Sequence, residues 1–185
     1  FIVANSLSWQ RDDWLKLGGG WHRVTVGSMG HTVIDAAARE TPAVKLVATA
    51  RKLENDKLRV RFAADGTVAS VYDKENEREA IAEGQAANRL AVYEDPGDGW
   101  DFRSNYDQHE ALAFELVSAE ARIDGPRAIV KQTYTHGKSK LIQEAVLMAG
   151  GRRLDFVTRV DWKESGRMLR TSFPVAVHAT EATCD

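Results

Sequence analysis

Residues 114–162 read FELVSAEARIDGPRAIVKQTYTHGKSKLIQEAVLMAGGRRLDFVTRVDW. Four strand-like runs follow one another here, at the spacing of roughly 8–12 residues that is typical of a β-sandwich or barrel. Asp-Gly-Pro, His-Gly-Lys and Ala-Gly-Gly separate the runs, and these are turn sequences. In the last run, Leu154 and Phe156 fall on one face, whereas Asp155 falls on the other. The stretch therefore predicts four consecutive antiparallel strands with one face buried.

Strand-like alternation of apolar and polar residues also occurs upstream of this stretch. Apolar residues and arginines alternate over Lys57–Phe62, which is the period of a half-buried strand. Asp65 and Gly66 follow, and this pair is a strong hairpin signal because glycine tolerates the positive φ that such turns require. Thr67–Asp73 then reads as the return strand.

The rest of the chain adds shorter elements. Five strand-like runs precede residue 51, and the three glycines at 18–20 are expected to form a flexible turn between two of them. Asp35–Glu40 and Ala80–Asn88 are each expected to form a helical turn, and Met168–Val177 is expected to form a further strand. The predicted fold is all-β and antiparallel, with a small β-domain at residues 1–52 and a larger β-sandwich at residues 53–185.

Composition excludes several classes of function. The 185 residues carry a net charge of −2, which argues against the basic face that a nucleic-acid-binding protein needs. No apolar run approaches the roughly 20 residues that span a bilayer. Cys184 is the single cysteine, so no internal disulfide can form, and we expect a cytoplasmic protein. Both ends of the sequence lie in strand-like runs, which suggests a piece of a longer protein.

The loop Asp95–Asp107 is the best candidate for a site, because it combines acids with aromatic residues. Its carboxylates could bind calcium or form a glycosidase pair, although their spacing establishes neither. Trp100 and Asp101 suggest sugar binding, since an indole stacks on the C–H face of a sugar and a carboxylate accepts hydroxyl hydrogen bonds. The alternative is that Trp100 packs against the end of the sandwich and Asp101 caps a turn.

Five segments, in order along nearly the whole chain, resemble one known family. They are Asn5–Asp13, Gly66–Glu79, Ala82–Asp101, Gly137–Trp162 and Phe173–Thr183. Together they are similar to the C-terminal β-region of glycoside hydrolase family 38 α-mannosidases, and most of all to the cytosolic and bacterial branch. The resemblance implies a galactose mutarotase-like supersandwich preceded by a small β-domain.

The resemblance also implies a function for the full-length protein, which is the retaining hydrolysis of α-mannosides at a zinc-type divalent metal centre. In that family the aspartate nucleophile and the metal ligands belong to the N-terminal α/β domain and the helical segment after it. Because those motifs are absent here, we expect no catalytic residue, metal or other cofactor in this chain. Its expected partners are its own N-terminal catalytic and helical domains and a mannose-containing oligosaccharide. Whether the protein also forms a homo-oligomer is left open by the sequence.

The acidic loop departs from the family pattern at one step. Relatives commonly carry Trp-Asp-Ala-Trp-Asp here, whereas this chain matches only at Trp100-Asp101 and continues with Phe102-Arg103. A role in substrate binding therefore carries over only to Trp100 and Asp101. Two alternatives to a part of a glycosidase remain, a non-catalytic carbohydrate-binding module and a structural sandwich. A lone mutarotase fits less well, because no paired His and Glu are placed to open a sugar ring.

Overall fold

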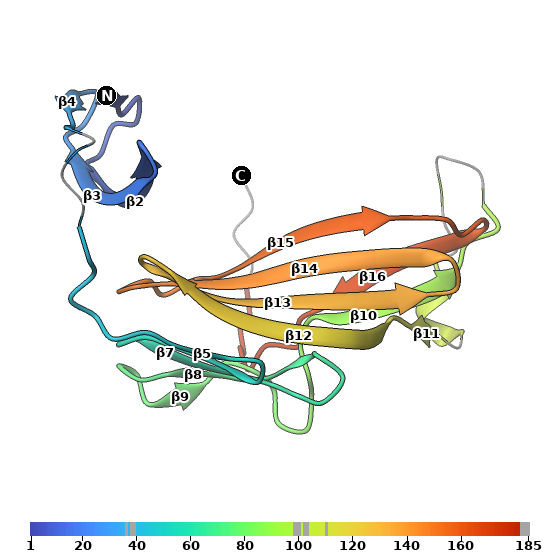
Figure 1. Ribbon diagram of the computed structural model, residues 1–185. Coiled ribbons are helices and arrows are strands. Elements are labelled where there is room, and N and C mark those ends of the chain that lie inside the picture. Colours follow the sequence, from blue (N-terminus) through green and yellow to red (C-terminus); the bar gives the residue numbers. More distant parts are fainter. Residues whose placement is uncertain (36, 38–39, 98–100, 102–103, 110, 182–185) are drawn as a thin grey trace.

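The computed structural model describes residues 1–35, 37, 40–97, 101, 104–109 and 111–181 of the chain. Within these residues there are sixteen β-strands and one short 3-10 helix, and there is no α-helix. Every pair of neighbouring strands runs antiparallel (Figure 1). The predicted all-β, antiparallel fold class is confirmed. None of the described segments is a helix long and apolar enough to cross a membrane.

The largest element is a sheet of four long strands that follow the chain order. These strands are β12 (Glu115–Asp124), β13 (Arg127–His136), β14 (Ser139–Met148) and β15 (Leu154–Asp161). Gly125 and Gly137 occupy the first two turns with φ of 57° and 53°, a left-handed conformation that glycine adopts at little cost. The four strands expected from the quoted stretch are confirmed, with bounds within a few residues of those predicted.

A second sheet of five shorter strands lies below the first in Figure 1. Its strands are β5 (Val47–Thr49), β6 (Lys52–Glu54), β7 (Leu58–Phe62), β8 (Val68–Asp73) and β9 (Arg78–Glu79). The alternation in β7 buries Leu58, Val60 and Phe62, as predicted. Asp65 and Gly66 form the β7–β8 turn, and Gly66 has a φ of 86°.

The two sheets pack face to face through the main hydrophobic core. The five-stranded sheet contributes Leu53, Leu58, Val60, Phe62 and Val68, and the four-stranded sheet contributes Ala128, Val130, Ala145 and Leu147. These side chains reach the same layer because strand residues two apart point to the same face. Removing this apolar surface from water is the main stabilising term of the sandwich.

A third sheet covers the remaining part of the same face. It consists of β10 (Arg89–Glu94) between β11 (Leu112–Ala113) and β16 (Arg167–Ser172). Leu90 and Val92 of β10 form a second core with Phe114, Tyr134 and Leu141. The inner face of the β12–β15 sheet is therefore shared between two neighbouring sheets.

The N-terminal strands form two hairpin-like pairs at one end of the sandwich (Figure 1). β1 (Ile2–Ala4) pairs with β4 (His31–Val33), and β2 (Arg11–Leu17) pairs with β3 (Gly20–Val26). Gly18 and Gly19 connect β2 to β3 with φ of 56° and 80°, which confirms the predicted glycine turn. Positive φ at both positions suits a tight two-residue hairpin.

A polar cluster joins these strands to the tip of the β12–β13 hairpin. The indole N–H of Trp21 donates to Asp124 at 2.9 Å. Lys16 and Arg127 form ion pairs with the same carboxylate, at 3.3 and 2.8 Å. The Arg127 guanidinium also lies 5.1 Å from the centre of the Trp21 ring. Gly125 sits so close to this ring that a side chain there would collide with it.

The helical turn expected at residues 80–88 is wrong. Ala87 instead exchanges backbone hydrogen bonds with Val68, at 2.8 and 2.9 Å, so the segment runs alongside the sheet. Gly84 has a φ of 70°, which a right-handed helix does not contain. A helix of this length is marginal by itself, and pairing with β8 satisfies its backbone groups better.

Two other expectations are not tested. The turn at Asp35–Glu40 includes residues 36 and 38–39, which lie outside the described residues. The division into domains at residue 52 stays a prediction. β5 precedes that position and pairs with β6, so the first strand of the five-stranded sheet begins before it.

The shared core makes a direct prediction about stability. Leu147 is fully buried, and Leu147→Ala should lower the free energy of unfolding by about 2–5 kcal/mol through lost burial and an unfilled cavity. Leu112 is 47% exposed, and Leu112→Ala should change it by no more than about 0.5 kcal/mol. Urea denaturation of both variants measures the difference. Equal losses would contradict the placement of the core.

The Trp21 cluster predicts a specific pH dependence. Hydrogen bonds from Trp21 and Arg127 lower the pKa of Asp124 to about 2 from its ordinary 3.8. Since the folded-state pKa is the lower one, the ionised carboxylate stabilises the fold above about pH 4, and this contribution is lost as the pH falls toward 2. Unfolding midpoints measured from pH 5 to about 2 should fall more steeply for the wild type than for Asp124→Asn. Parallel profiles would show that the cluster does not stabilise the fold.

Candidate functional site

The acidic loop predicted as a site leaves the end of β10 and is held at its base. The Tyr93 and Tyr106 rings meet edge to face, with their centres 5.1 Å apart. The Arg170 guanidinium lies 4.5 Å from the centre of the Tyr106 ring. The backbone N–H of Asp95 donates to the carbonyl of Gly166 at 2.9 Å. Residues from both β10 and β16 therefore anchor the start and the end of the loop.

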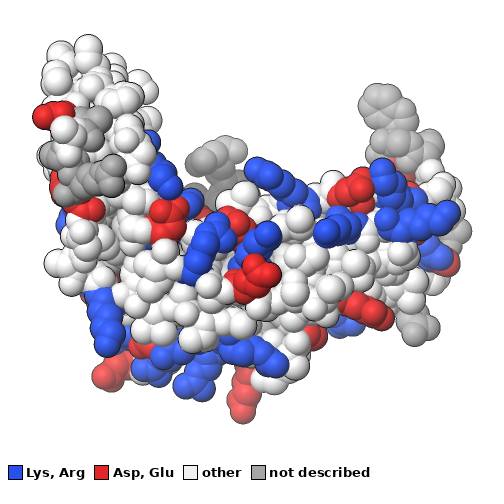
Figure 2. Space-filling view, in the orientation of Figure 1, with Lys and Arg blue, Asp and Glu red and all other residues white. Residues whose placement is uncertain are grey.

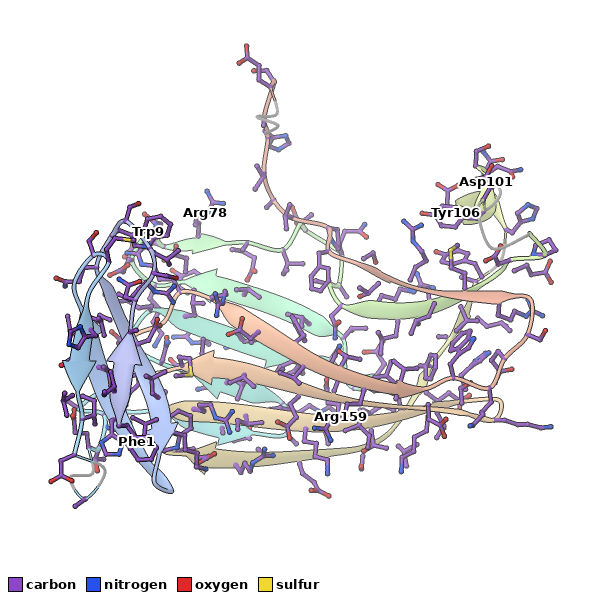
Figure 3. The ribbon with its side chains drawn as sticks, turned by 90° about the horizontal axis from the view of Figure 1, so that it is seen from above. Phe1, Trp9, Arg78, Asp101, Tyr106 and Arg159 are labelled. Carbon is purple, nitrogen blue, oxygen red and sulfur yellow. The ribbon has the colours of Figure 1, made fainter. Side chains whose placement is uncertain are left out.

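Of the two candidate residues in this loop, only Asp101 is described. Asp101 is exposed, and Figure 3 shows it with Tyr106 at the end of the molecule opposite Trp9. Trp100 lies outside the described residues, so the structure gives the position of only one of the two residues predicted to bind a sugar. Gly97 packs against the carbonyl of Asp101 too closely to allow a side chain. The backbones of Gly97 and Asp101 are therefore in close contact.

The carboxylates of the loop do not assemble a metal site within the described residues. No group of three His, Cys, Asp or Glu side chains converges anywhere in this part of the chain. Glu94 is paired with Arg167 at 3.1 Å, and Asp107 is an exposed residue of the 3-10 helix η1 (Tyr106–Gln108). The described residues of the loop therefore contain no set of ligands that could bind calcium.

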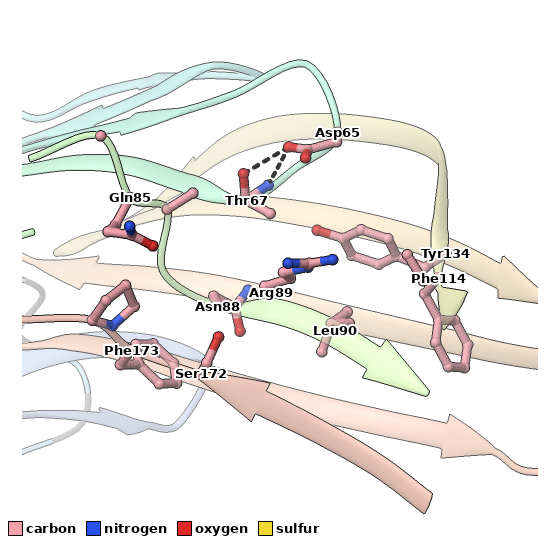
Figure 4. Close-up of a pocket in the computed structure, with 14 residues that line it drawn as sticks. Asp65, Thr67, Gln85, Asn88, Arg89, Leu90, Phe114, Tyr134, Ser172 and Phe173 are labelled. Atoms are coloured by element: carbon pink, nitrogen blue, oxygen red, sulfur yellow. Dashed lines mark hydrogen bonds between the residues drawn. The ribbon is translucent and has the colours of Figure 1, made fainter. Parts of the chain in front are cut away.

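A separate cavity of about 790 Å³ opens where the five-stranded sheet meets the three-stranded sheet (Figure 4). The β7–β8 turn, the segment before β10 and the end of β16 form its walls. Its polar lining includes Asp65, Thr67, Gln85, Asn88, Arg89 and Ser172. Its apolar lining includes Leu90, Phe114, Tyr134 and Phe173. The volume lies within the range of roughly 300–1,000 Å³ that is usual for small-molecule sites.

One wall of this cavity is fixed by two buried side chains of β13. Gln132 Nε2 and the Tyr134 hydroxyl both donate to the carbonyl of Gly66, at 2.9 and 3.2 Å. Gly66 has no room for a side chain, because the Tyr134 hydroxyl occupies that space. Burial, with the nearby Asp65 charge, raises the pKa of Tyr134. The hydroxyl therefore stays protonated and remains a donor to the turn.

The floor of the cavity rests on a second buried amide. Asn88 Nδ2 donates to Gln143 Oε1 at 2.6 Å, and Gln143 Nε2 donates to Thr158 Oγ1 at 2.9 Å. Asn88 has a φ of 58°, a left-handed conformation that Asn adopts more readily than most residues. This network fixes the backbone just before Arg89, which is the first residue of β10.

Sequence reasoning did not identify this cavity. Gln132 and Gln143 lie opposite each other in neighbouring strands, on the face that otherwise carries apolar residues. A glutamine in place of an apolar residue, at an inward position of two consecutive strands, is the available signal. The sequence around Arg89 contains no comparable signal, because a charged residue at the start of a strand is common.

Comparison with known proteins places this architecture in a family. Residues 53–185 match the sequence model described as "Glycosyl hydrolases family 38 C-terminal domain". The chain belongs to glycosyl hydrolase family 38. The resemblance inferred from the sequence is therefore confirmed, and the match covers the five-stranded, three-stranded and four-stranded sheets from β7 onward.

Relatives within family 38 are longer proteins. The chain is 28% identical to Alpha-mannosidase 2C1 of Homo sapiens and of Mus musculus, over 98% of this chain and 19% of each relative. It is 25% identical to Alpha-mannosidase G of Dictyostelium discoideum, over 70% of this chain and 13% of that relative. The chain thus spans about a fifth or less of the length of the curated relatives that it matches.

The close contact between Gly97 and Asp101 in the acidic loop can be tested by substitution. Gly97→Ala should displace the Asp101 backbone, because the new methyl group collides with the Asp101 carbonyl. We expect amide chemical shifts to change across residues 95–107 and the free energy of unfolding to fall by on the order of 1–3 kcal/mol. Gly27→Ala is the control, since nothing lies within 4 Å of the added group. Similar spectra for both variants would contradict the loop geometry.

Proposed function

We propose that this chain is the C-terminal β-region of a retaining α-mannosidase, and that the acidic loop lines the sugar pocket of the full-length enzyme. Membership of family 38 over residues 53–185 is the observation that carries the proposal. The three relatives named above are α-mannosidases by name, and two of them match along 98% of this chain. The chain by itself is then inactive, because the nucleophile belongs to another part of the enzyme.

The zinc-type metal of such an enzyme would be bound outside this chain. A ligand set of three convergent His, Cys, Asp or Glu side chains is absent from the described residues, so they do not fit a metal centre. The role of this chain in the reaction is to bind and orient the sugar. The proposal also retains the division at residue 52, a cytoplasmic location and contacts with the N-terminal catalytic and helical domains.

Trp100 and Asp101 are assigned to sugar binding by their chemistry. An indole face offers apolar contact to the C–H surface of a pyranose ring. A carboxylate accepts hydrogen bonds from sugar hydroxyl groups, and bonds to a charged acceptor are stronger than neutral ones. The contacts among Tyr93, Tyr106 and Arg170 fix the base of the loop that carries these two residues.

This assignment predicts a loss of activity in the full-length protein. Trp100→Ala and Asp101→Asn should each lower kcat/KM for an aryl α-mannoside by about tenfold or more. Trp100→Ala removes the apolar stacking surface, and Asp101→Asn removes a charged hydrogen-bond acceptor. Trp9→Ala and Asp13→Asn are matched controls, since Trp9 is 58% exposed and both residues belong to the N-terminal strands or their connection.

The outcome is read against both the controls and the fold. Kinetics indistinguishable from those of the control variants would remove the loop from the sugar pocket. Unfolding midpoints should match the wild-type value, because Asp101 is exposed and the substitution keeps its size.

A further inference from the structure

The cavity between the sheets contains a cation without an ionic partner. Arg89 is exposed, and its side chain makes no ion pair or hydrogen bond with any residue that the structure describes. Ser172 lies beside it in the β10–β16 register, and its hydroxyl also lines the cavity. A guanidinium carries five N–H donors in a fixed planar array, so this group can donate several hydrogen bonds to a ligand.

A carboxylate stands on the other wall. Asp65 Oδ1 accepts hydrogen bonds from the Thr67 N–H at 3.0 Å and the Thr67 hydroxyl at 2.7 Å (Figure 4). These bonds hold the carboxylate in the β7–β8 turn, while Oδ2 accepts none from the described residues. Asp65 and Arg89 are not within ion-pair distance of each other, so each can contact a ligand between them.

An aromatic ring completes the lining. Phe173 is 47% exposed, and its ring contacts Phe156 with the ring centres 5.7 Å apart. Phe173 is therefore held by a neighbouring ring while about half of its surface stays open to solvent. Pro174 follows it and also lines the cavity. An exposed aromatic face that is held by a second ring is suited to stacking against an apolar ligand surface.

We propose that this cavity is a second saccharide site, separate from the acidic loop. Arg89 donates hydrogen bonds to sugar oxygens, Asp65 accepts them from hydroxyl groups, and Phe173 stacks on the C–H face of the ring. The site lies at the Arg89 end of β10, and the acidic loop follows the Glu94 end, roughly 15–20 Å away along the strand.

The charges select a neutral saccharide over other classes of ligand. A small anion would find the Arg89 guanidinium but would face the Asp65 carboxylate, which costs electrostatic energy in a half-enclosed site. A purely apolar ligand would remove Arg89, Asp65 and Ser172 from water without replacing their hydrogen bonds. A saccharide satisfies both signs of polar group and also has an apolar face.

The surrounding network prepares the site before a ligand arrives. Gln132 and Tyr134 fix the turn that carries Asp65, whereas Gln143 fixes Asn88 immediately before Arg89. Both walls are thereby tied to adjacent strands of one sheet. Binding a ligand therefore costs little backbone entropy, and this favours affinity for a small ligand.

Titration of the full chain with methyl α-mannoside and α-mannobiose tests the assignment, with amide chemical shifts as the readout. We expect saturable shifts at residues 65–67, 84–90 and 172–174. Arg89→Ala should weaken binding by about tenfold, the equivalent of one hydrogen bond to a charged group, and Phe173→Ala should also weaken it. Arg159→Ala is the matched control, because Arg159 is an exposed arginine of β15 outside the cavity (Figure 3).

Three outcomes would overturn the proposal. They are the absence of saturable shifts, equal affinity in Arg89→Ala and Arg159→Ala, and displacement of the sugar by inorganic phosphate, which would indicate an anion site. Urea midpoints equal to the wild-type value show that each variant is folded. The readout is binding, not hydrolysis, so this proposal and the proposed function can fail independently.

Discussion

One face of the β12–β15 sheet must be covered by two other sheets, and the rest of the structure follows from this constraint. Each of its long strands presents one row of apolar side chains, because residues two apart share a face. Val130 and Ala145 pack on the five-stranded sheet, whereas Tyr134 and Leu141 pack on the three-stranded sheet. Positive and negative side chains are interspersed over the face shown in Figure 2. Arg122 and Glu144 form one ion pair between neighbouring charges, at 2.8 Å.

Gln132 and Gln143 lie at the boundary between the two cores. Both are almost fully buried, and a buried amide without hydrogen bonds destabilises a protein. Gln132 finds the carbonyl of Gly66, and Gln143 finds Asn88. Each amide therefore fixes one of the two covering sheets, and the space left between those sheets is the cavity that contains Arg89.

The elements that the sequence predicted well depend on local signals. The four long strands alternate strongly and are separated by glycine turns, so their bounds could be placed within a few residues. The helical turn expected at residues 80–88 is wrong because the backbone of Ala87 pairs with Val68 of strand β8, and this contact is not visible in the local sequence pattern. The cavity could not be predicted for the same reason. Its walls come from three separated segments, Phe114 and Tyr134 are added from two others, and only tertiary packing brings them together.

The candidate loop could be chosen from composition, since Trp100 and Asp101 have sugar-binding chemistry and the family pattern continues to this step. Its anchoring could not be foreseen, because Arg170 reaches Tyr106 from a strand more than sixty residues later. Composition thus identified chemical groups, whereas the fold determines which of them are held in a fixed position.

The length of the β12–β13 hairpin has a geometric consequence. Its ten-residue strands extend roughly 33 Å. Trp21 is bound at the tip of this hairpin, and the acidic loop lies toward the other end (Figure 1). Because the strands are nearly fully extended and hydrogen-bonded to one another, the sheet fixes the distance between the Trp21 cluster and the base of the acidic loop. The N-terminal strands and the base of the acidic loop are therefore held apart by one continuous sheet.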